Sequence, residues 1–215
     1  MNKSLYIFRH GETDWNVERR TQGWIDIPLN HSGIEQANDL AKVLEPIGLD
    51  IIYSSPLLRA LETANIVAKI NDTKILTNDD LRERNFGVLG GKIVHLTDKP
   101  EEEQLDLSKD LIVMQSSRMW NPDFVPENGE SHNDLVSRSV AAILGIAKNC
   151  DKFKIGISTH GGVARSLISK FINFDIPTGG MPNATYFKLD WDGEKLSLKD
   201  LPDWLKSNQT PKGGE

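Results

Sequence analysis

The stretch SLYIFRHGETDWN, residues 4–16, joins an apolar run to a cluster of charged and polar side chains. The run from Lys3 to Phe8 predicts a strand of a sheet core, because it is short, apolar and bounded by polar residues. Arg9, His10 and Gly11 follow it at once. Charged groups at the end of a buried strand are costly unless they are paired or used. The stretch therefore predicts both a strand and a site at its carboxyl end.

Size and charge limit the classes of protein to consider. The 215 residues, 38% of them hydrophobic, suit one domain with an insertion. The net charge of −6 argues against a general nucleic-acid binder. No apolar run approaches the roughly 18 residues of a membrane helix, and the N-terminus lacks the pattern of a secretory signal. We therefore expect a cytoplasmic protein that binds neither nucleic acid nor membrane, with the oligomeric state left open and a homodimer as one option.

The rest of the chain alternates predicted strands and helices. Strands are predicted at residues 49–54, 73–76 and 152–159. Helices are predicted after a Ser32 cap with Ile34, Ala37, Leu40, Ala41 and Leu44 on one face, after a Ser55 cap with Pro56 at the first position, after a Ser131 cap, and over residues 161–172. Residues 10–31 are predicted as loop, and residues 184–200 as a hairpin that turns at Asp192-Gly193. Cys150, the single cysteine, predicts a buried apolar thiol near a helix end.

This alternation predicts an α/β fold, a three-layer α/β/α sandwich with a mostly parallel sheet. The final hairpin adds an antiparallel element at one edge. Residues from about 90 to 128 break the rhythm and predict an inserted cap, partly helical, over one end of the sheet. We expect a single domain over residues 1–205 and a flexible tail over residues 206–215.

Polar side chains follow each predicted strand, where ligands bind in open α/β sheets. These are Arg9 and His10 after the first, Ser54, Ser55 and Arg59 after the second, Glu83 after the third, and His160, Gly161 and Gly162 after the fourth. Two histidines, several arginines, a glutamate and two helix N-termini are thus expected to face one cleft.

This collection has a chemical logic. Arginine forks and a glycine-opened helix N-terminus suit phosphate oxygens. Histidine can act as a covalent nucleophile, and glutamate can protonate a leaving oxygen. No Cys/His cluster or carboxylate cage indicates a metal or another cofactor, so the arginines would supply the positive charge. Each feature alone has a structural explanation, such as a strand-end histidine or a solvated helix arginine. Their coincidence favours a site.

The motifs RHGETDWN, TQGWIDIPLNHSG, YSSPLLRALETA, LRERNFG, ENGES and STHGG, in that order, resemble the histidine phosphatase superfamily. Specifically, they resemble its cofactor-dependent phosphoglycerate mutase-like branch, over about residues 5–165. The resemblance implies that His10 attacks phosphorus and becomes phosphohistidine, and that Glu83 protonates the leaving oxygen and later deprotonates water. It implies a phosphoryl-binding set made of Arg9, Arg59 and His160, with further donors from Asn16, Gln22, Gly23 and the Gly161 amide.

Glu130 stands in the GES stretch that many phosphatases of this branch carry beside the pocket, so the resemblance implies that it belongs to the substrate-binding residues, with its exact role left open. The acid phosphatase branch fits less well. In that branch the motif is RHGxRxP and the acid comes from an HD pair, whereas here Asp14 and Asn16 fill the second Arg and Pro positions. His160 is followed by glycine, which favours Glu83 as the acid.

Departures in the cap bear on the substrate. Phe86 replaces the Tyr of the glycolytic mutases, Val94 stands at their Lys position, no Arg-Arg pair occurs between 90 and 130, and residues 101–103 are EEE. An acidic, base-poor cap should bind a doubly phosphorylated acid poorly and admit water. We therefore expect a metal-independent phosphomonoesterase that acts on a small phosphorylated metabolite. The alternatives are a phosphoglycerate mutase and a non-catalytic phospho-ligand or protein-binding module, against which the intact His10, Glu83 and His160 argue.

Overall fold

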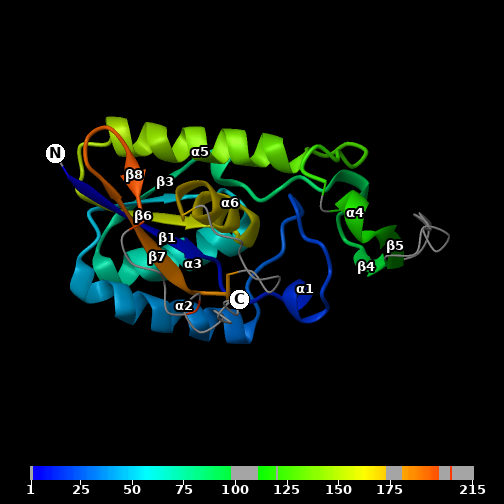
Figure 1. Ribbon diagram of the computed structural model, residues 1–215. Coiled ribbons are helices and arrows are strands. Elements are labelled where there is room, and N and C mark those ends of the chain that lie inside the picture. Colours follow the sequence, from blue (N-terminus) through cyan, green and yellow to red (C-terminus); the bar gives the residue numbers. More distant parts are fainter. Residues whose placement is uncertain (1, 98–110, 120, 173–180, 199–203, 205–215) are drawn as a thin grey trace, which may run out of the picture.

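The structure is a computed structural model that describes residues 2–97, 111–119, 121–172, 181–198 and 204. Its main sheet has six strands in the spatial order β3-β2-β6-β1-β7-β8. Their bounds are β1 Lys3–Arg9, β2 Ile51–Ser54, β3 Lys74–Thr77, β6 Lys154–Thr159, β7 Tyr186–Trp191 and β8 Leu196–Ser197. Strands β3, β2, β6 and β1 are parallel, and β7 pairs antiparallel with both β1 and β8. The predicted mostly parallel sheet with an antiparallel edge is confirmed (Figure 1).

Helices cover both faces of this sheet. Helices α2, His31–Leu44, and α3, Leu58–Asn71, lie on one face; α5, His132–Asn149, and α6, Gly161–Ile172, lie on the other (Figure 1). This arrangement confirms the predicted three-layer sandwich. Among the described helices, none is long and apolar enough to cross a membrane.

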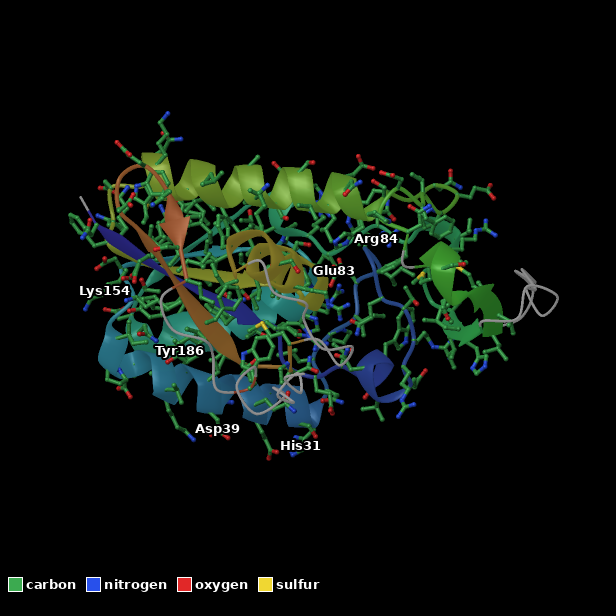
Figure 2. The ribbon with its side chains drawn as sticks, in the orientation of Figure 1. His31, Asp39, Glu83, Arg84, Lys154 and Tyr186 are labelled. Carbon is green, nitrogen blue, oxygen red and sulfur yellow. The ribbon has the colours of Figure 1, made fainter. Side chains whose placement is uncertain are left out.

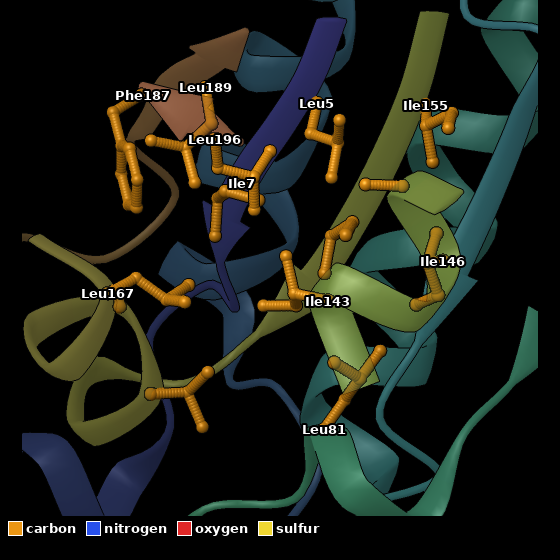
Figure 3. Packing of buried hydrophobic residues seen from close by; sticks show 14 of the residues in the cluster. Leu5, Ile7, Leu81, Ile143, Ile146, Ile155, Leu167, Phe187, Leu189 and Leu196 are labelled. Atoms are coloured by element: carbon orange, nitrogen blue, oxygen red, sulfur yellow. The ribbon is translucent and has the colours of Figure 1, made fainter. Parts of the chain in front are cut away.

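The alternation of side chains along β1 explains why both faces are covered. Leu5 and Ile7 are buried in a cluster with residues of α5 and α6, such as Ile143 and Leu167 (Figure 3). The neighbouring Phe8 packs in a second cluster with residues of α2 and α3. Successive strand residues point to opposite faces, so a strand that is apolar on both needs helices on both. Burial of each such side chain contributes about 1.5–3 kcal/mol.

Two helix starts differ from the prediction because their caps come from elsewhere. The Asn30 side chain, not Ser32, caps α2 by accepting a hydrogen bond from the Gly33 amide at 2.8 Å, and Ile34 is 46% exposed. Helix α3 begins at Leu58 instead of Pro56, since the Leu58 amide donates to Asp26 at 2.9 Å. Asp26 lies 32 positions before Leu58, so no local pattern reveals this cap.

Other predicted boundaries agree more closely. Ser131 caps α5 through a capping box, α6 spans residues 161–172, and Asp192 accepts the turn amides of the β7–β8 hairpin. Cys150 is buried at the C-terminal end of α5, as expected. The predicted loop 10–31 contains one helical turn, α1, Asp14–Val17, which the Thr13 side chain caps.

The described residues between 90 and 128 lie beyond one end of the main sheet (Figure 1). They form two parallel strands, β4 Ile93–Thr97 and β5 Leu111–Gln115, and a short helix, α4 Ser116–Met119. The helical part described there is thus one turn, and the strand pair was not predicted. The acidic residues 101–103 and the tail 206–215 lie outside the described residues.

The chain leaving β1 passes very close to the start of α2. A side-chain Cβ at Gly11 would lie 2.3 Å from the Gly33 carbonyl oxygen, and one at Gly33 would lie 2.0 Å from that of Glu12. Real Cβ atoms do not approach backbone this closely, so both positions need glycine. This contact fixes the backbone that carries His10.

Candidate active site

Most of the predicted site residues line one pocket of about 280 Å³ at the carboxyl end of the sheet. They come from the end of β1, from α1 and the loop after it, from the first turn of α3, from the loop after β3 and from the first residue of α6. The predicted residues in its wall are Arg9, His10, Asn16, Gln22, Gly23, Arg59, Glu83 and Gly161. His160 lies directly behind His10, with ring centroids 5.2 Å apart, whereas Glu130 lines neither this pocket nor the one next to it.

His10 presents one ring nitrogen with a free lone pair. Its side chain is 3% exposed, and Nδ1 lies 2.7 Å from the Gly11 carbonyl oxygen. A carbonyl can only accept, so Nδ1 carries the hydrogen and Nε2 keeps its lone pair. Burial, and next the positive charge of Arg59, hold the pKa of His10 well below its usual value of 6.5. The imidazole is therefore neutral at pH 7 and suited to act as a nucleophile.

His160 is fully buried and turns one nitrogen toward Ser55. Its Nε2 lies 2.8 Å from Ser55 Oγ, while Nδ1 is buried and has no hydrogen-bond partner in the described part of the chain. Burial, followed by the charge of Arg59, lowers the pKa of His160 well below 6.5. A buried, unmatched polar atom is rare in proteins and indicates a missing ligand or water.

Two arginines bring further unmatched nitrogens to the same place. Arg59 is 1% exposed and donates its terminal nitrogens to the carbonyls of Gly23 and Ile25 at 2.8 and 3.1 Å. Arg9 donates to the Met181 carbonyl. The Nε atoms of Arg9 and Arg59 are both buried and have no acceptor within the described residues.

Burial lowers the pKa of Arg59 to about 10, against the opposing effect of the Glu83 carboxylate. Burial also lowers the pKa of Arg9. At neutral pH Arg59 still carries its charge, which the nearby Glu83 and Asp26 carboxylates help to stabilise. The two arginines and His160 thus define a site that an anion with several acceptor oxygens would satisfy.

Two side-chain amides and one helix start also line the same pocket. The Asn16 side-chain oxygen accepts from the Thr13 amide, the Thr13 hydroxyl and Asn183, which leaves its amide nitrogen as a donor. Gln22 is 9% exposed, and its side-chain oxygen has no hydrogen-bond partner among the described residues. Gly161 opens α6 at the pocket wall. The N-terminus of α3 does not serve an anion as expected, because Asp26 occupies it.

Glu83 lies between this pocket and a second one. Its two carboxylate oxygens accept one backbone amide each, from Gly162 at 2.9 Å and from Arg84 at 2.8 Å. Each oxygen keeps a further lone pair for a proton or a ligand. Glu83 and Phe86 also line the second pocket of about 340 Å³, whose other wall residues are Arg84, Met119, His132, Leu135, Gly162 and Arg165. Figure 2 shows Glu83 and Arg84 on the side of the sheet that faces the cap.

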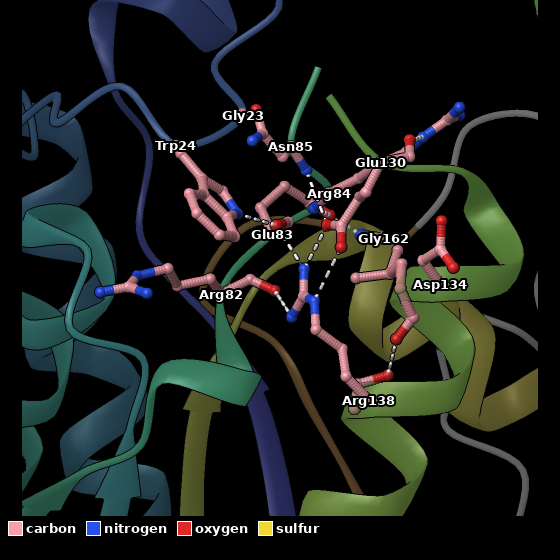
Figure 4. A network of polar contacts seen from close by, with 12 residues as sticks. Gly23, Trp24, Arg82, Glu83, Arg84, Asn85, Glu130, Asp134, Arg138 and Gly162 are labelled. Atoms are coloured by element: carbon pink, nitrogen blue, oxygen red, sulfur yellow. Dashed lines mark hydrogen bonds and ion pairs between the residues drawn. The ribbon is translucent and has the colours of Figure 1, made fainter. Parts of the chain in front are cut away.

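Glu130 is occupied by protein groups. Arg138 binds both of its carboxylate oxygens, and one of them also accepts from the Asn85 amide at 2.8 Å (Figure 4). The expectation that Glu130 binds substrate is not tested by these contacts, but they show a second use of the side chain.

Several residues of the site were not predicted from the sequence. Arg19, Arg20 and Thr21 line the first pocket, next to the predicted Gln22 and Gly23. Arg19 has the left-handed φ of 56°, which is unusual for arginine and invisible in the sequence. The run RRTQG, between two motifs already assigned to the site, was the available signal.

Asn183 also supports the site from a distance. Its side chain donates to the carbonyls of His10 and Gly11 at 3.1 Å each, and so helps to fix the backbone of the nucleophile. It lies far in sequence from every motif singled out above, so no pattern indicated it. Together these contacts hold a neutral, nucleophilic ring nitrogen in an electropositive, partly buried pocket.

Comparison with known proteins gives a consistent result. A family model described as the histidine phosphatase superfamily, branch 1, matches residues 5–203. The chain is 37% identical over 168 residues to phosphoglycerate mutase-like protein 4 of Arabidopsis thaliana, covering 77% of this chain and 70% of the relative. It is 30% identical over 199 residues to the uncharacterized phosphatase PhoE of Bacillus subtilis strain 168, covering 92% and 93%. The solved structure of Bacillus stearothermophilus YhfR superimposes with a TM-score of 0.76 at 32% identity, covering 92% and 95%.

Proposed function

The chain belongs to branch 1 of the histidine phosphatase superfamily, and we propose that it is a metal-independent phosphomonoesterase that forms phosphohistidine at His10. One observation carries the proposal. His10, whose Nε2 keeps a free lone pair, lines one pocket with Arg9 and Arg59, whose Nε atoms have no acceptor in the described part of the chain, and its ring packs 5.2 Å from that of His160. A phosphoryl dianion would supply the missing acceptors and place its phosphorus against the nucleophile.

In the first step Nε2 of His10 forms a bond to phosphorus while the bond from phosphorus to the alcohol oxygen breaks. Glu83 gives its proton to that oxygen, since an alkoxide leaves poorly. Arg9 and Arg59 hold the charge on the phosphoryl oxygens in the transition state. In the second step Glu83 takes a proton from water, the water oxygen bonds to phosphorus, and the bond to Nε2 breaks. Alcohol and inorganic phosphate are released, and His10 and protonated Glu83 are regenerated.

The position of Glu83 indicates where the alcohol would lie. An acid must reach both the phosphoryl group and the leaving oxygen, and Glu83 lines the pocket of His10 as well as the second pocket. The alcohol part of the substrate then belongs in the second pocket, against the apolar side chains of Phe86, Met119 and Leu135. A small phosphorylated metabolite is the substrate class we propose.

A phosphoglycerate mutase is the second candidate, and one observation favours it. The guanidinium groups of Arg84 and Arg165 line the second pocket, together with His132, whose pKa burial lowers below its usual value of 6.5, so two positive charges border the space proposed for the alcohol. All three lie outside residues 90–130, on which the expectation of a base-poor pocket rested. The mutase and the phosphatase share the first step and differ in whether water or a second hydroxyl receives the phosphoryl group. The cytoplasmic location and the oligomeric state stay predictions from the sequence.

The test is turnover of p-nitrophenyl phosphate and of a panel of phosphorylated metabolites with EDTA present. We expect phosphate release from both, lost in His10→Ala while the circular dichroism spectrum is kept. Isomerisation of phosphoglycerate faster than phosphate release would establish the mutase instead. Binding of phosphorylated ligands without turnover of any would establish a non-catalytic module, and activity abolished by EDTA would contradict metal independence.

A further inference from the structure

Arg138, on α5, uses every donor that its side chain has. Its Nε and one terminal nitrogen bind the two carboxylate oxygens of Glu130. Its remaining donors go to three backbone carbonyls of one loop, those of Asp80, Arg82 and Glu83, at 2.8–2.9 Å. A guanidinium has five N–H groups, and the structure gives five acceptors. Figure 4 shows this side chain at the centre of the network.

Glu130 completes the network from the other side of the same loop. One of its oxygens accepts the Asn85 amide at 2.8 Å, and its backbone amide donates to the Asn85 carbonyl at 2.9 Å. The Arg138 and Glu130 side chains are only 17% and 15% exposed. The loop from Asp80 to Asn85 is therefore held at both ends by one partly buried ion pair.

The residue at the middle of this loop is Glu83. Its carbonyl accepts from Arg138 and, at 2.7 Å, from the Trp24 indole nitrogen. Its carboxylate reaches the Gly162 amide, and the space there is tight: a Cβ on Gly162 would lie 2.1 Å from Glu83 Oε1. A small rotation of the loop would thus move the carboxylate away from the wall that the two pockets share.

We propose that Arg138 is a positioning residue that aims the Glu83 carboxylate at the leaving oxygen, and that Glu130 serves as its counterion and second anchor. The inference rests on the proposed function, in which Glu83 is the acid. Neither Arg138 nor Glu130 lines either pocket, so neither needs to touch substrate. Charge alone does not explain this arrangement, because three of the five acceptors are backbone carbonyls that a compact ammonium could not reach together.

The test is a double-mutant cycle between Arg138→Gln and Glu83→Gln, measured as the pre-steady-state burst on an alkyl phosphate. Displacing a catalytic group by about 1 Å costs on the order of 100-fold, so we expect a loss of up to that size from Arg138→Gln alone. In the Glu83→Gln background the same substitution should lower the burst rate by less than about threefold, because the carboxyl group that Arg138 positions is absent there. On p-nitrophenyl phosphate, whose leaving group needs no proton, the loss should be clearly smaller.

Two further variants separate an effect on the position of the Glu83 carboxylate from an effect on the stability of the fold. Arg138→Lys keeps the charge and should recover the melting temperature more than the alkyl phosphate burst. Lys148→Gln is the matched control: it removes a positive charge from the same helix, α5, where Lys148 is exposed in the last turn and lines neither pocket. It should stay near the wild-type burst rate. Where Arg138→Gln does not fold, Glu130→Gln takes its place in the cycle.

The outcomes distinguish a failure of the positioning role of Arg138 from a failure of the proposed function. Equal losses from the Arg138 substitution in both Glu83 backgrounds, or on both substrates, would overturn the positioning role while leaving Glu83 as the acid. Glu83→Gln with the same loss for both leaving groups would instead remove Glu83 from the acid role, and the inference would fall with it. If Arg138→Lys recovered the full alkyl phosphate burst rate, the positive charge of residue 138 would be sufficient and the guanidinium hydrogen bonds would not be needed. That result would also overturn the inference.

Discussion

The substitution Gly162→Ala tests the position of the Glu83 carboxylate by adding a single methyl group next to it. The new Cβ would lie 2.1 Å from Glu83 Oε1 and 3.0 Å from the carboxyl carbon. Ordinary contact begins at 3.4 Å, so the carboxylate has to retreat by about 1 Å or more. Because Arg138 holds the backbone of this loop, the adjustment falls on the Glu83 side chain, which can rotate away from the Gly162 amide.

The magnitude follows from that displacement. A misplacement of about 1 Å costs roughly 100-fold in rate, or about 2.7 kcal/mol of barrier. Stability should change little, because alanine gains up to about 1 kcal/mol over glycine in a helix. Weakening the hydrogen bond from the Gly162 amide to Glu83, which is 2.9 Å long in the native chain, should lower the free energy of unfolding by a similar amount. The variant should therefore melt within a few degrees of the wild type while losing most of its activity on alkyl substrates.

The assay compares burst rates on an alkyl phosphate and on p-nitrophenyl phosphate, with Gly145→Ala as control. Gly145 lies inside α5 with open space around its added methyl group, so its alanine should stabilise the helix and leave both rates unchanged. In Gly162→Ala the alkyl rate should fall about 100-fold and the nitrophenyl rate clearly less. A Gly162→Ala enzyme with wild-type alkyl phosphate rates would refute the assignment of Glu83 as the acid at this wall.

Two arginines and the histidine pair of the site give three more predictions. Arg59→Ala should lower kcat by about 100-fold, since it removes a charged donor to the transition state; a raised KM with unchanged kcat would show that Arg59 only binds substrate. Arg19→Asn, which keeps a residue tolerant of the left-handed φ of 56°, should raise KM by up to about fivefold and spare kcat, and an unchanged KM would show that the Arg19 side chain does not reach the substrate. Because the pKa values of His10 and His160 lie well below 6.5 in the fold, the unfolded chain binds more protons below that pH. Urea unfolding without phosphate should then show stability present above pH 6.5 and lost as the pH falls, by up to about 1.4 kcal/mol per pH unit for each histidine; a flat profile in the same range would contradict the buried neutral pair.

The sequence predicted those parts of the site that depend on strand ends. His10, Arg9 and Gly161 lie at or just past the ends of β1 and β6, and parallel strands bring their carboxyl ends to one edge whatever the loops do. The two faces of the sheet were predictable for the same reason, because the apolar pattern of each strand is local. Ser131 was predictable as a cap because it directly precedes the helical pattern, and its partner in the structure, Asp134, lies only three residues away.

What the sequence could not show depends on contacts between distant segments. Asp26 accepts the Leu58 amide at the start of α3 across 32 positions, while Ser55, the predicted cap, accepts the Leu57 amide and also contacts His160. Arg138 holds the loop of Glu83 across 55 positions and resembles, in sequence, any solvated arginine of a helix. The cap strands pair with each other away from the main sheet, so the alternation that predicted the core gave no signal for them.

The most direct test of the central claim is to trap the phosphoenzyme. The enzyme would be quenched in alkaline denaturant during turnover of a labelled phosphomonoester, digested and mapped by mass spectrometry. We predict a phosphoryl group that is stable to base, labile to acid and located on the peptide that contains His10. A label on His160 or Ser55, or turnover with a burst but no phosphoenzyme, would contradict the account.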